Sequence, residues 1–82
     1  MGEIEELNDI KELIEENYNR FISVYDYEDE IRMTDGSAGH YLDISLDGGK
    51  VYFEGVRGND EEVEDECEAD EKSVLSTLSA AF

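Results

Sequence analysis

The acidic run from Asp60 to Glu71 limits what this chain can fold into more than any other feature of the sequence. Nine of its twelve residues are Asp or Glu. On a helix, like charges four residues apart weaken the structure, and acids are favourable only near its N-terminus. A continuous helix through the run is therefore disfavoured by its own charge.

The apolar residues in and after this run leave two interpretations of it. Helical spacing relates Val63, Cys67, Val74 and Leu78. Together with a cap formed by Asn59 and Glu62, this spacing would give one helix over about residues 60–81. The alternative is an acidic loop over residues 59–72, followed by a short helix over SVLSTLSAA. Charge repulsion favours the loop.

The net charge decides what the chain can bind. Its 82 residues include 24 acids against 6 Lys and Arg, which gives a formal net charge of −18. Carboxylates repel phosphates, so we expect neither bare nucleic acid nor an anionic membrane surface as a ligand. The natural partners of such a chain are basic: a nucleic-acid-binding protein, a polycation or metal ions.

An amphipathic helix is predicted near the N-terminus, within EIEELNDIKELIEENYNRF. Apolar residues recur there at three- and four-residue spacing: Ile4, Leu7, Ile10, Leu13, Ile14, Tyr18 and Phe21. Asp9 followed by Glu12 could form a capping box, so the helix begins near Glu3 or near Asp9. The stripe already includes Ile4 and Leu7, which favours the earlier start.

Alternation of polar and apolar residues predicts antiparallel strands in the middle of the chain. Residues 25–34 form either one bent strand or two short strands that meet near Glu28. HYLDISL and KVYFEGVRG are joined by DGG at residues 47–49, and Asp-Gly tolerates the positive φ angles of a hairpin turn. One face of this hairpin would carry His40, Leu42, Ile44 and Leu46, with Val51 and Phe53 on one face of its second strand.

These elements predict a single α+β domain over residues 1–82. Its order is a helix, a three-stranded antiparallel sheet and a C-terminal helix, with both helices covering one face of the sheet. No apolar run approaches the roughly 20 residues that span a bilayer. A chain with one cysteine and no signal peptide is expected in the cytoplasm.

The hairpin sequence DISLDGGKVYFE also resembles the calcium loop of EF-hand proteins. Asp43, Ser45, Asp47, Gly48 and Glu54 occupy the positions of that motif. A lysine stands where the family has an aliphatic residue, and both flanks alternate as strands rather than helices. A hairpin with a DGG turn is favoured, and a calcium-binding module is the alternative.

Catalysis is not expected from the few reactive side chains. Ser37 lies near His40, which is the only histidine, and Cys67 is the only cysteine, so a nucleophile and a base could be assembled from them. A structural role for His40 fits better. Carboxylates around Cys67 should raise the pKa of its thiol and make it a poor nucleophile. One Cys and one His do not make a zinc site. We predict no enzyme, no cofactor and no metal.

The acidic run itself has three interpretations. It is a solvated loop, or an adaptation to a salty cytoplasm in a chain with few lysines, or a docking surface. Duplex DNA carries one charge per ~1.7 Å, while a helix rises ~1.5 Å and a strand ~3.3 Å per residue. A mostly acidic segment approaches the charge density of DNA. It can therefore occupy a groove built for phosphates, which favours the docking surface.

The EIEELNDIKELIEENY helix, the YLDISLDGGKVYFEG hairpin and the DEEVEDECEADE run resemble, in layout, small phage-encoded anti-defence proteins, anti-CRISPR proteins above all. The resemblance implies inhibition of a CRISPR effector at its nucleic-acid-binding or PAM-reading surface, in the cytoplasm of the host cell. Acidic nuclease immunity proteins and glycosylase inhibitors are similar in character.

We therefore predict an acidic inhibitor that mimics nucleic acid and blocks a basic site on a CRISPR effector or another nuclease. An acidic domain of halophile type with an unspecified interaction role is the alternative. Tyr25, Tyr27 and Tyr52 would supply anchors or pack in the sheet. The predicted contact residues are Asp60, Glu61, Glu62, Glu64, Asp65, Glu66, Glu68, Asp70 and Glu71, extended by Asp26, Glu28, Asp29 and Glu30 if that sheet edge lies alongside.

Overall fold

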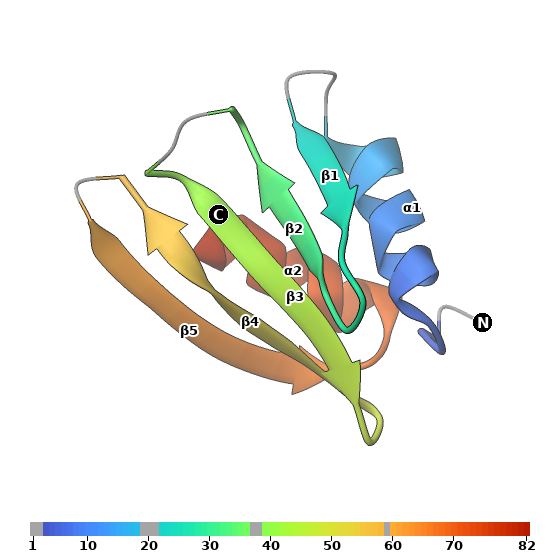
Figure 1. Ribbon diagram of the computed structural model, residues 1–82. Helices are drawn as coiled ribbons and strands as arrows, with labels where there is room; N and C mark the ends of the chain where they lie inside the picture. The colour runs from blue at the N-terminus through green and yellow to red at the C-terminus, as the bar shows by residue number, and fades with distance from the viewer. Residues whose placement is uncertain (1–2, 19–21, 37–38, 59) are drawn as a thin grey trace.

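Five antiparallel strands and two helices make up the computed structural model, which describes residues 3–18, 22–36, 39–58 and 60–82 (Figure 1). The strands follow one another in the sheet in chain order, β1 to β5. Both helices lie behind the sheet as it is drawn in Figure 1, so they share one face of it. The elements are α1 (Leu7–Asn17), β1 (Ser23–Asp26), β2 (Ile31–Thr34), β3 (Tyr41–Asp47), β4 (Lys50–Arg57), β5 (Glu61–Glu68) and α2 (Glu71–Ala81).

The predicted α+β class is confirmed, but the number of strands is five and not three. Residues 25–34 contribute to two strands, β1 and β2, which pair with Val24 opposite Met33. The fifth strand is β5, which is the acidic run itself. Both sequence interpretations of that run, as a loop or as part of a helix, are wrong over residues 61–68. Asn59, proposed as a helix cap, lies outside the described residues.

A strand accommodates this run because it separates the carboxylates. Neighbouring side chains of a strand point to opposite faces, and those on one face are about 6.6 Å apart along the strand. On a helix, residues three and four apart approach to about 5–6 Å between Cβ atoms. The four-residue interval from Val63 to Cys67 suits a helix, but it is also two periods of a strand, which is why it misled the sequence interpretation.

The N-terminal helix is confirmed, although it begins at Leu7 rather than near Glu3. The Asp9 carboxylate accepts hydrogen bonds of 3.1 Å from the main-chain N–H groups of Glu5 and Glu6, the two residues before the helix. Ile4 is nevertheless buried. It lies on an extended segment before the helix, and its N–H donates to the carbonyl of Ala69. Phe21, the last residue of the predicted stripe, lies outside the described residues.

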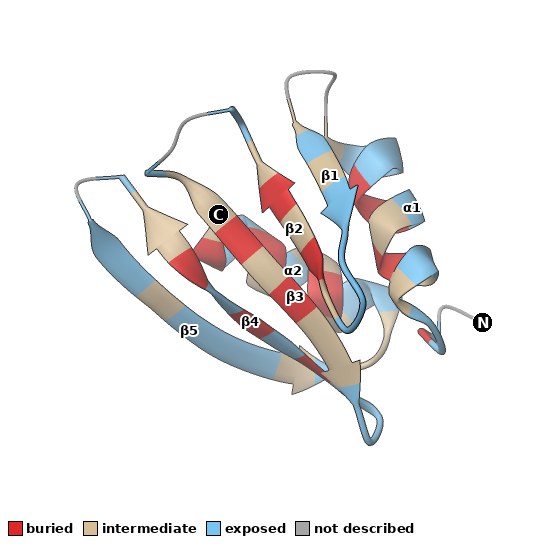
Figure 2. Cartoon of the chain, viewed as in Figure 1, coloured by how far each residue is buried: buried red, intermediate tan, exposed pale blue. Residues whose placement is uncertain are grey.

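The hydrophobic core fills the space between the two helices and the sheet (Figure 2). Leu42 and Ile44 on β3, with Val51 and Phe53 on β4, are buried as the alternation predicted. The remaining buried residues are Ile4, Ile10, Leu13, Ile14, Ile31, Met33, Val74, Leu78 and Ala81. The core therefore lies on one side of the sheet.

The predicted hairpin is confirmed as β3 and β4. Gly48 and Gly49 have φ angles of 57° and 80°, which match a two-residue turn with both central residues in the left-handed region. Asp47 pairs with Lys50, and Ile44 pairs with Phe53. The turn therefore sets the register that brings the apolar residues of both strands to the helix-covered face.

Neither helix in the described parts of the chain is long and apolar enough to cross a membrane.

Candidate protein-binding surface

The face of the sheet opposite the helices is the candidate site, and we call it the open face. Directly opposed residues of antiparallel strands share a face, and the register runs Tyr25, Arg32, Asp43, Glu54, Glu64 across all five strands. The alternate positions face the helices, and on β2, β3 and β4 they include the buried residues of the core. The open face therefore carries Ser23, Tyr25, Arg32, Thr34, Tyr41, Asp43, Ser45, Asp47, Lys50, Tyr52, Glu54, Val56, Glu62, Glu64, Glu66 and Glu68.

Four glutamates stand in line along β5 on this face: Glu62, Glu64, Glu66 and Glu68. All four are exposed, and they follow one another at about 6.6 Å along the strand. Among the described residues, the only ion pair that these four make is Glu66 with Lys50, at 3.9 Å. The row is therefore an almost uncompensated line of negative charge.

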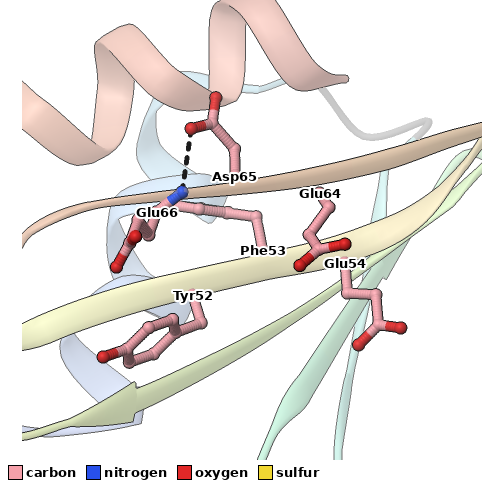
Figure 3. Close-up of a pocket in the computed structure, with 6 residues that line it drawn as sticks. All are labelled: Tyr52, Phe53, Glu54, Glu64, Asp65 and Glu66. Carbon is pink, nitrogen blue, oxygen red and sulfur yellow. Dashed lines mark hydrogen bonds between the residues drawn. The ribbon is translucent and has the colours of Figure 1, made fainter.

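Glu54 on β4 adds a fifth carboxylate directly opposite Glu64. Like charges in directly opposed positions destabilise a sheet. The close-up in Figure 3 shows both side chains on the same side of the sheet. Asp43, which opposes Glu54 from β3, is compensated because Arg32 donates to both of its carboxylate oxygens, at 2.7 and 3.0 Å. The packing of the core does not require the opposition of Glu54 and Glu64.

Tyrosines occupy the same open face. Tyr25, Tyr27 and Tyr52 are the exposed large hydrophobic residues among those described, at 53%, 51% and 39% of their surface. None of the three is packed into the core, and Tyr27, which lies outside the strands, has the Arg32 guanidinium 5.8 Å from its ring centroid. Tyr52 lies directly opposite Glu66, and Glu54 is its neighbour on the same face of β4. An aromatic face beside carboxylates suits an arginine or lysine side chain, which is attracted by both.

Arg32 is held on this face by several contacts. Its guanidinium carbon lies 4.2 Å from the ring centroid of Tyr41 and 5.8 Å from that of Tyr27. The hydrogen bonds that Arg32 donates to Asp43 raise the pKa of Arg32 further above its ordinary value. The positive charge nearest the centre of the open face is therefore engaged internally, and the field toward β5 stays negative.

Two hollows lie on the β4 and β5 side of the molecule and share Glu54 and Glu64. One is about 530 Å³ and is lined by Tyr52, Phe53, Glu54, Glu64, Asp65 and Glu66 (Figure 3). The other is about 550 Å³ and reaches across the sheet to Glu30, Tyr41 and Asp43. Both are bordered by acids, so each is chemically suited to a basic side chain.

The structure divides the predicted contact residues of the acidic run into three groups. Glu62, Glu64, Glu66 and Glu68 are on the open face. Glu61 and Asp65 alternate with them and point to the helix side, where Glu61 accepts a 3.1 Å bond from Arg57. Asp60 lies in the β4–β5 turn with a φ angle of 60°. These three acids do not belong to the row, and Asp70 and Glu71 bring the number outside it to five of the nine.

The last two acids of the run begin α2. Asp70 is the N-cap residue, and its carboxylate accepts bonds from the N–H and the hydroxyl of Ser73, at 2.8 and 2.9 Å. These bonds, the main-chain one first, lower the pKa of Asp70. Glu71 lies in the first turn, where the helix dipole favours a negative charge. Helix formation explains both residues without a partner.

The second acidic segment lies away from the first. Asp26 is the last residue of β1, and Glu28, Asp29 and Glu30 lie between β1 and β2. The strands β1 and β5 are the two opposite edges of the sheet. Asp26 accepts a 2.8 Å bond from Lys11 of α1. Glu30 alone borders a hollow together with Glu62 and Glu64. The condition under which these four acids would extend the contact, that their edge lies alongside the acidic run, is therefore not met, apart from the position of Glu30.

His40 has a structural environment, as its sequence position suggested. One ring nitrogen lies 2.9 Å from the Asp35 carboxylate and the other 2.9 Å from the carbonyl oxygen of Phe82. The rings of His40 and Phe82 are stacked with centroids 4.1 Å apart. These contacts hold the C-terminus against β3. Ser37, the nucleophile considered with it, lies outside the described residues.

Cys67 lies on the helix side of β5, half-buried near α2. Burial is the main reason why the pKa of its thiol is raised, with the carboxylates of Asp70, Asp65 and Glu68 adding to the effect. The raised pKa was expected from the surrounding acids, although burial contributes more. A protonated thiol in this position is a poor nucleophile.

The calcium-loop arrangement of Asp43–Glu54 is replaced by a two-stranded hairpin. The register pairs Asp43 with Glu54, while Asp47 lies at the far end of β3, beside the turn. Arg32 already donates hydrogen bonds to both oxygens of the Asp43 carboxylate. Within the described residues, no three His, Cys, Asp or Glu side chains are grouped so that they could hold a metal ion.

Glu54 and Tyr41 belong to the site but were not predicted as contact residues. The alternation in KVYFE already placed Tyr52 and Glu54 on one face. What the sequence lacked was the order of the strands, which puts this face beside the β5 glutamates.

Comparison with protein-family models, with curated proteins and with solved structures found no match.

Proposed function

We propose that this protein binds a basic, nucleic-acid-binding surface of a partner protein through its open face and thereby keeps nucleic acid away from that surface. The observation that carries the proposal is the row of four β5 glutamates with Glu54 and Tyr52 beside it. Their charges are exposed, nearly uncompensated and unnecessary for the core. A surface of this kind steers a positively charged partner into contact.

The charge spacing of β5 supports the comparison with a nucleic acid. Six of its eight residues are acidic, which corresponds to one charge per about 4.4 Å at a rise of ~3.3 Å per residue. One strand of duplex DNA carries a charge about every 3.4 Å. Counted over both of its faces, β5 therefore resembles a single strand in charge density more than a duplex, while the row on the open face has one carboxylate per about 6.6 Å. Lys and Arg side chains that bind phosphates can bind these carboxylates instead.

Displacement of DNA tests this proposal. A fluorescent DNA duplex bound to a basic effector or nuclease is titrated with this protein, and release is followed by anisotropy. A CRISPR effector is the first partner to use, because of the sequence resemblance. We expect the wild type to release the DNA. The open-face variant combines Glu54→Gln, Glu62→Gln, Glu64→Gln and Glu66→Gln. We expect its affinity for the partner to be lower than that of the wild type by about tenfold or more, which corresponds to about 1.4 kcal/mol.

The matched control changes four acids outside the open face. Glu5→Gln, Glu12→Gln, Glu15→Gln and Glu16→Gln lie in or before α1 and remove the same charge. This control should compete nearly as well as the wild type, particularly at physiological salt, where screening suppresses long-range effects. Equal losses in the two variants would show that total charge acts without a defined site.

A further inference from the structure

The outer edge of β5 has main-chain groups that are free to pair. β5 is the last strand of the sheet, and Figure 1 shows it at the border of the described molecule. The N–H of Ala69 donates to the carbonyl of Gly49 at 3.1 Å, so the opposed pairs at odd positions are the hydrogen-bonded ones. The main-chain groups of Glu62, Glu64, Glu66 and Glu68 therefore point away from β4.

Two of these four residues already use one outward group each. The N–H of Glu66 donates to the Asp65 carboxylate at 2.8 Å, and the carbonyl of Glu68 accepts from the N–H of Asp70 at 2.9 Å. Within the described ranges, no hydrogen bond reaches the outward groups of Glu62 and Glu64. A pairing edge is therefore open over the middle of β5.

This edge is long and regular. All eight residues of β5 pair with β4 in one continuous register, which gives about 26 Å of strand. The chain contains no proline. Edge strands are commonly protected from unwanted pairing by charge, by proline or by a bulge. Of these three features β5 has only charge, and its charged side chains lie on both faces of the strand.

The sign of that charge selects what can pair. A second copy of β5 would place carboxylates against carboxylates, which is unfavourable for directly opposed residues. A strand that alternates Lys or Arg with apolar residues would place opposite charges beside Glu62, Glu64 and Glu66 instead. Pairing of this edge with β5 of a second molecule is therefore unfavourable, whereas its charge is complementary to that of a basic strand.

An extended segment of the same chain pairs with the residues that follow β5, on the β4 side. The N–H of Ile4 donates to the carbonyl of Ala69 at 2.9 Å, and Glu3 forms an antiparallel bridge with Asp70. This contact lies just beyond the C-terminal end of β5. The carbonyl of Ala69 belongs to an odd position, and Ile4 and Gly49 border one hollow, so this contact lies on the β4 side and does not cover the outer edge of β5.

We infer that β5 accepts a basic extended segment of the partner as a sixth strand of the sheet. The main-chain hydrogen bonds supply affinity in this mode of binding, and the glutamates select the basic sequence. The inference rests on the proposed function, since it names the part of the partner that is bound.

The test compares Glu64→Pro with Glu64→Ala. Both remove the same carboxylate, but only proline removes the outward N–H, and it leaves the hydrogen bonds to β4 in place. The probe is a seven-residue peptide that alternates Arg and Val, and its affinity is measured by NMR titration. We expect Glu64→Pro to bind about tenfold more weakly than Glu64→Ala, and the peptide to slow amide hydrogen exchange at Glu62 and Glu64 in the wild type.

Equal affinities of the two variants, or unchanged exchange at both amides, would overturn strand addition. If circular dichroism shows that Glu64→Pro is unfolded, Glu62→Pro with Glu62→Ala replaces the pair, and the exchange measurement needs no variant. DNA displacement separates this inference from the proposed function. If Glu64→Pro still releases DNA as well as Glu64→Ala does, while the four-glutamine open-face variant does not, the face binds the partner and the edge does not.

Discussion

Acids that look equivalent in the sequence have different environments in the structure. Asp70 caps a helix, Glu61 binds Arg57, and Glu64 stands exposed opposite another glutamate. Arg57 also donates to the carbonyl of Ala80 at 2.7 Å, so it joins the C-terminal end of α2 to β5. A charge count over the acidic run therefore overstates the number of residues that are available to a partner.

Asp70 gives a prediction at this scale, with a definite dependence on pH. Hydrogen bonds from Ser73 lower the pKa of Asp70 in the folded state. Its carboxylate therefore stabilises the fold above the pKa of the unfolded chain, near 3.9, and this stabilisation is lost as the pH falls through the lower folded value. We expect Asp70→Ala to be less stable than the wild type at pH 7, with the difference shrinking below about pH 4.

Urea unfolding at pH 7, 5 and 3, followed by circular dichroism, measures this difference. Asp70→Asn is the control, because an asparagine can still accept the N–H of Ser73. It should lose less stability at pH 7 than Asp70→Ala. A difference between wild type and Asp70→Ala that is as large at pH 3 as at pH 7 would contradict the capping role.

At the scale of elements, the stability of β5 depends on its pairing with β4 and on its contacts with the core. Acidic residues have little intrinsic preference for strands, so the strand is stabilised by pairing along β4 and by contacts of Val63 and Cys67 with the core. Gly55 lies opposite Val63 on one side and opposite Leu42 on the other. Main-chain atoms of Tyr41 and Leu42 on β3 occupy the space that a side chain at this position would need.

Gly55→Ala tests this approach. A Cβ atom at position 55 would lie 2.8 Å from the Cα of Leu42 and would collide with the carbonyl oxygen of Tyr41. Because both are main-chain atoms, the strands must move apart, and we expect a loss of about 1–3 kcal/mol or more in the free energy of unfolding. Gly39→Ala, where nothing lies within 4 Å, should change stability by less than about 0.5 kcal/mol. Urea unfolding that finds the two variants alike would contradict the close approach.

At the scale of the whole molecule, charge and core are on opposite sides. The apolar contacts lie between the sheet and the helices, while the open face presents glutamates to solvent. Repulsion within this face, and the net charge of −18, oppose folding without disturbing the core. The fold should therefore form at low salt with a reduced margin of stability.

Salt dependence tests that balance. We expect a folded circular dichroism spectrum at 10 mM KCl and a urea midpoint that rises toward 1 M KCl. The Debye length falls from about 30 Å to about 3 Å over that range, and opposed side chains such as Glu54 and Glu64 are separated by about 5 Å between Cβ atoms. A chain that is unfolded until molar salt is added would favour the halophile-type interpretation and weaken the case for a docking surface.

Local patterns in the sequence were sufficient for both helices, the β3–β4 hairpin and the core residues of these elements. Apolar residues at three- and four-residue intervals define a helix face, alternation defines a strand face, and Asp-Gly-Gly defines a turn, because each depends only on residues close in the chain. The starts of both helices were misplaced: Ile4 belongs to the core without belonging to α1, and α2 begins at Glu71, two residues before SVLSTLSAA.

The tertiary structure alone decided the identity of the acidic run and the composition of the open face. Val63 and Cys67 fit either periodicity, so the strand exists because β4 offers it a partner and the core covers its apolar side. The strand order then places Glu54 beside Glu64 and separates Asp26 from both. Pairing joins residues that are distant in the chain, and no local pattern of side chains specifies which strands will meet.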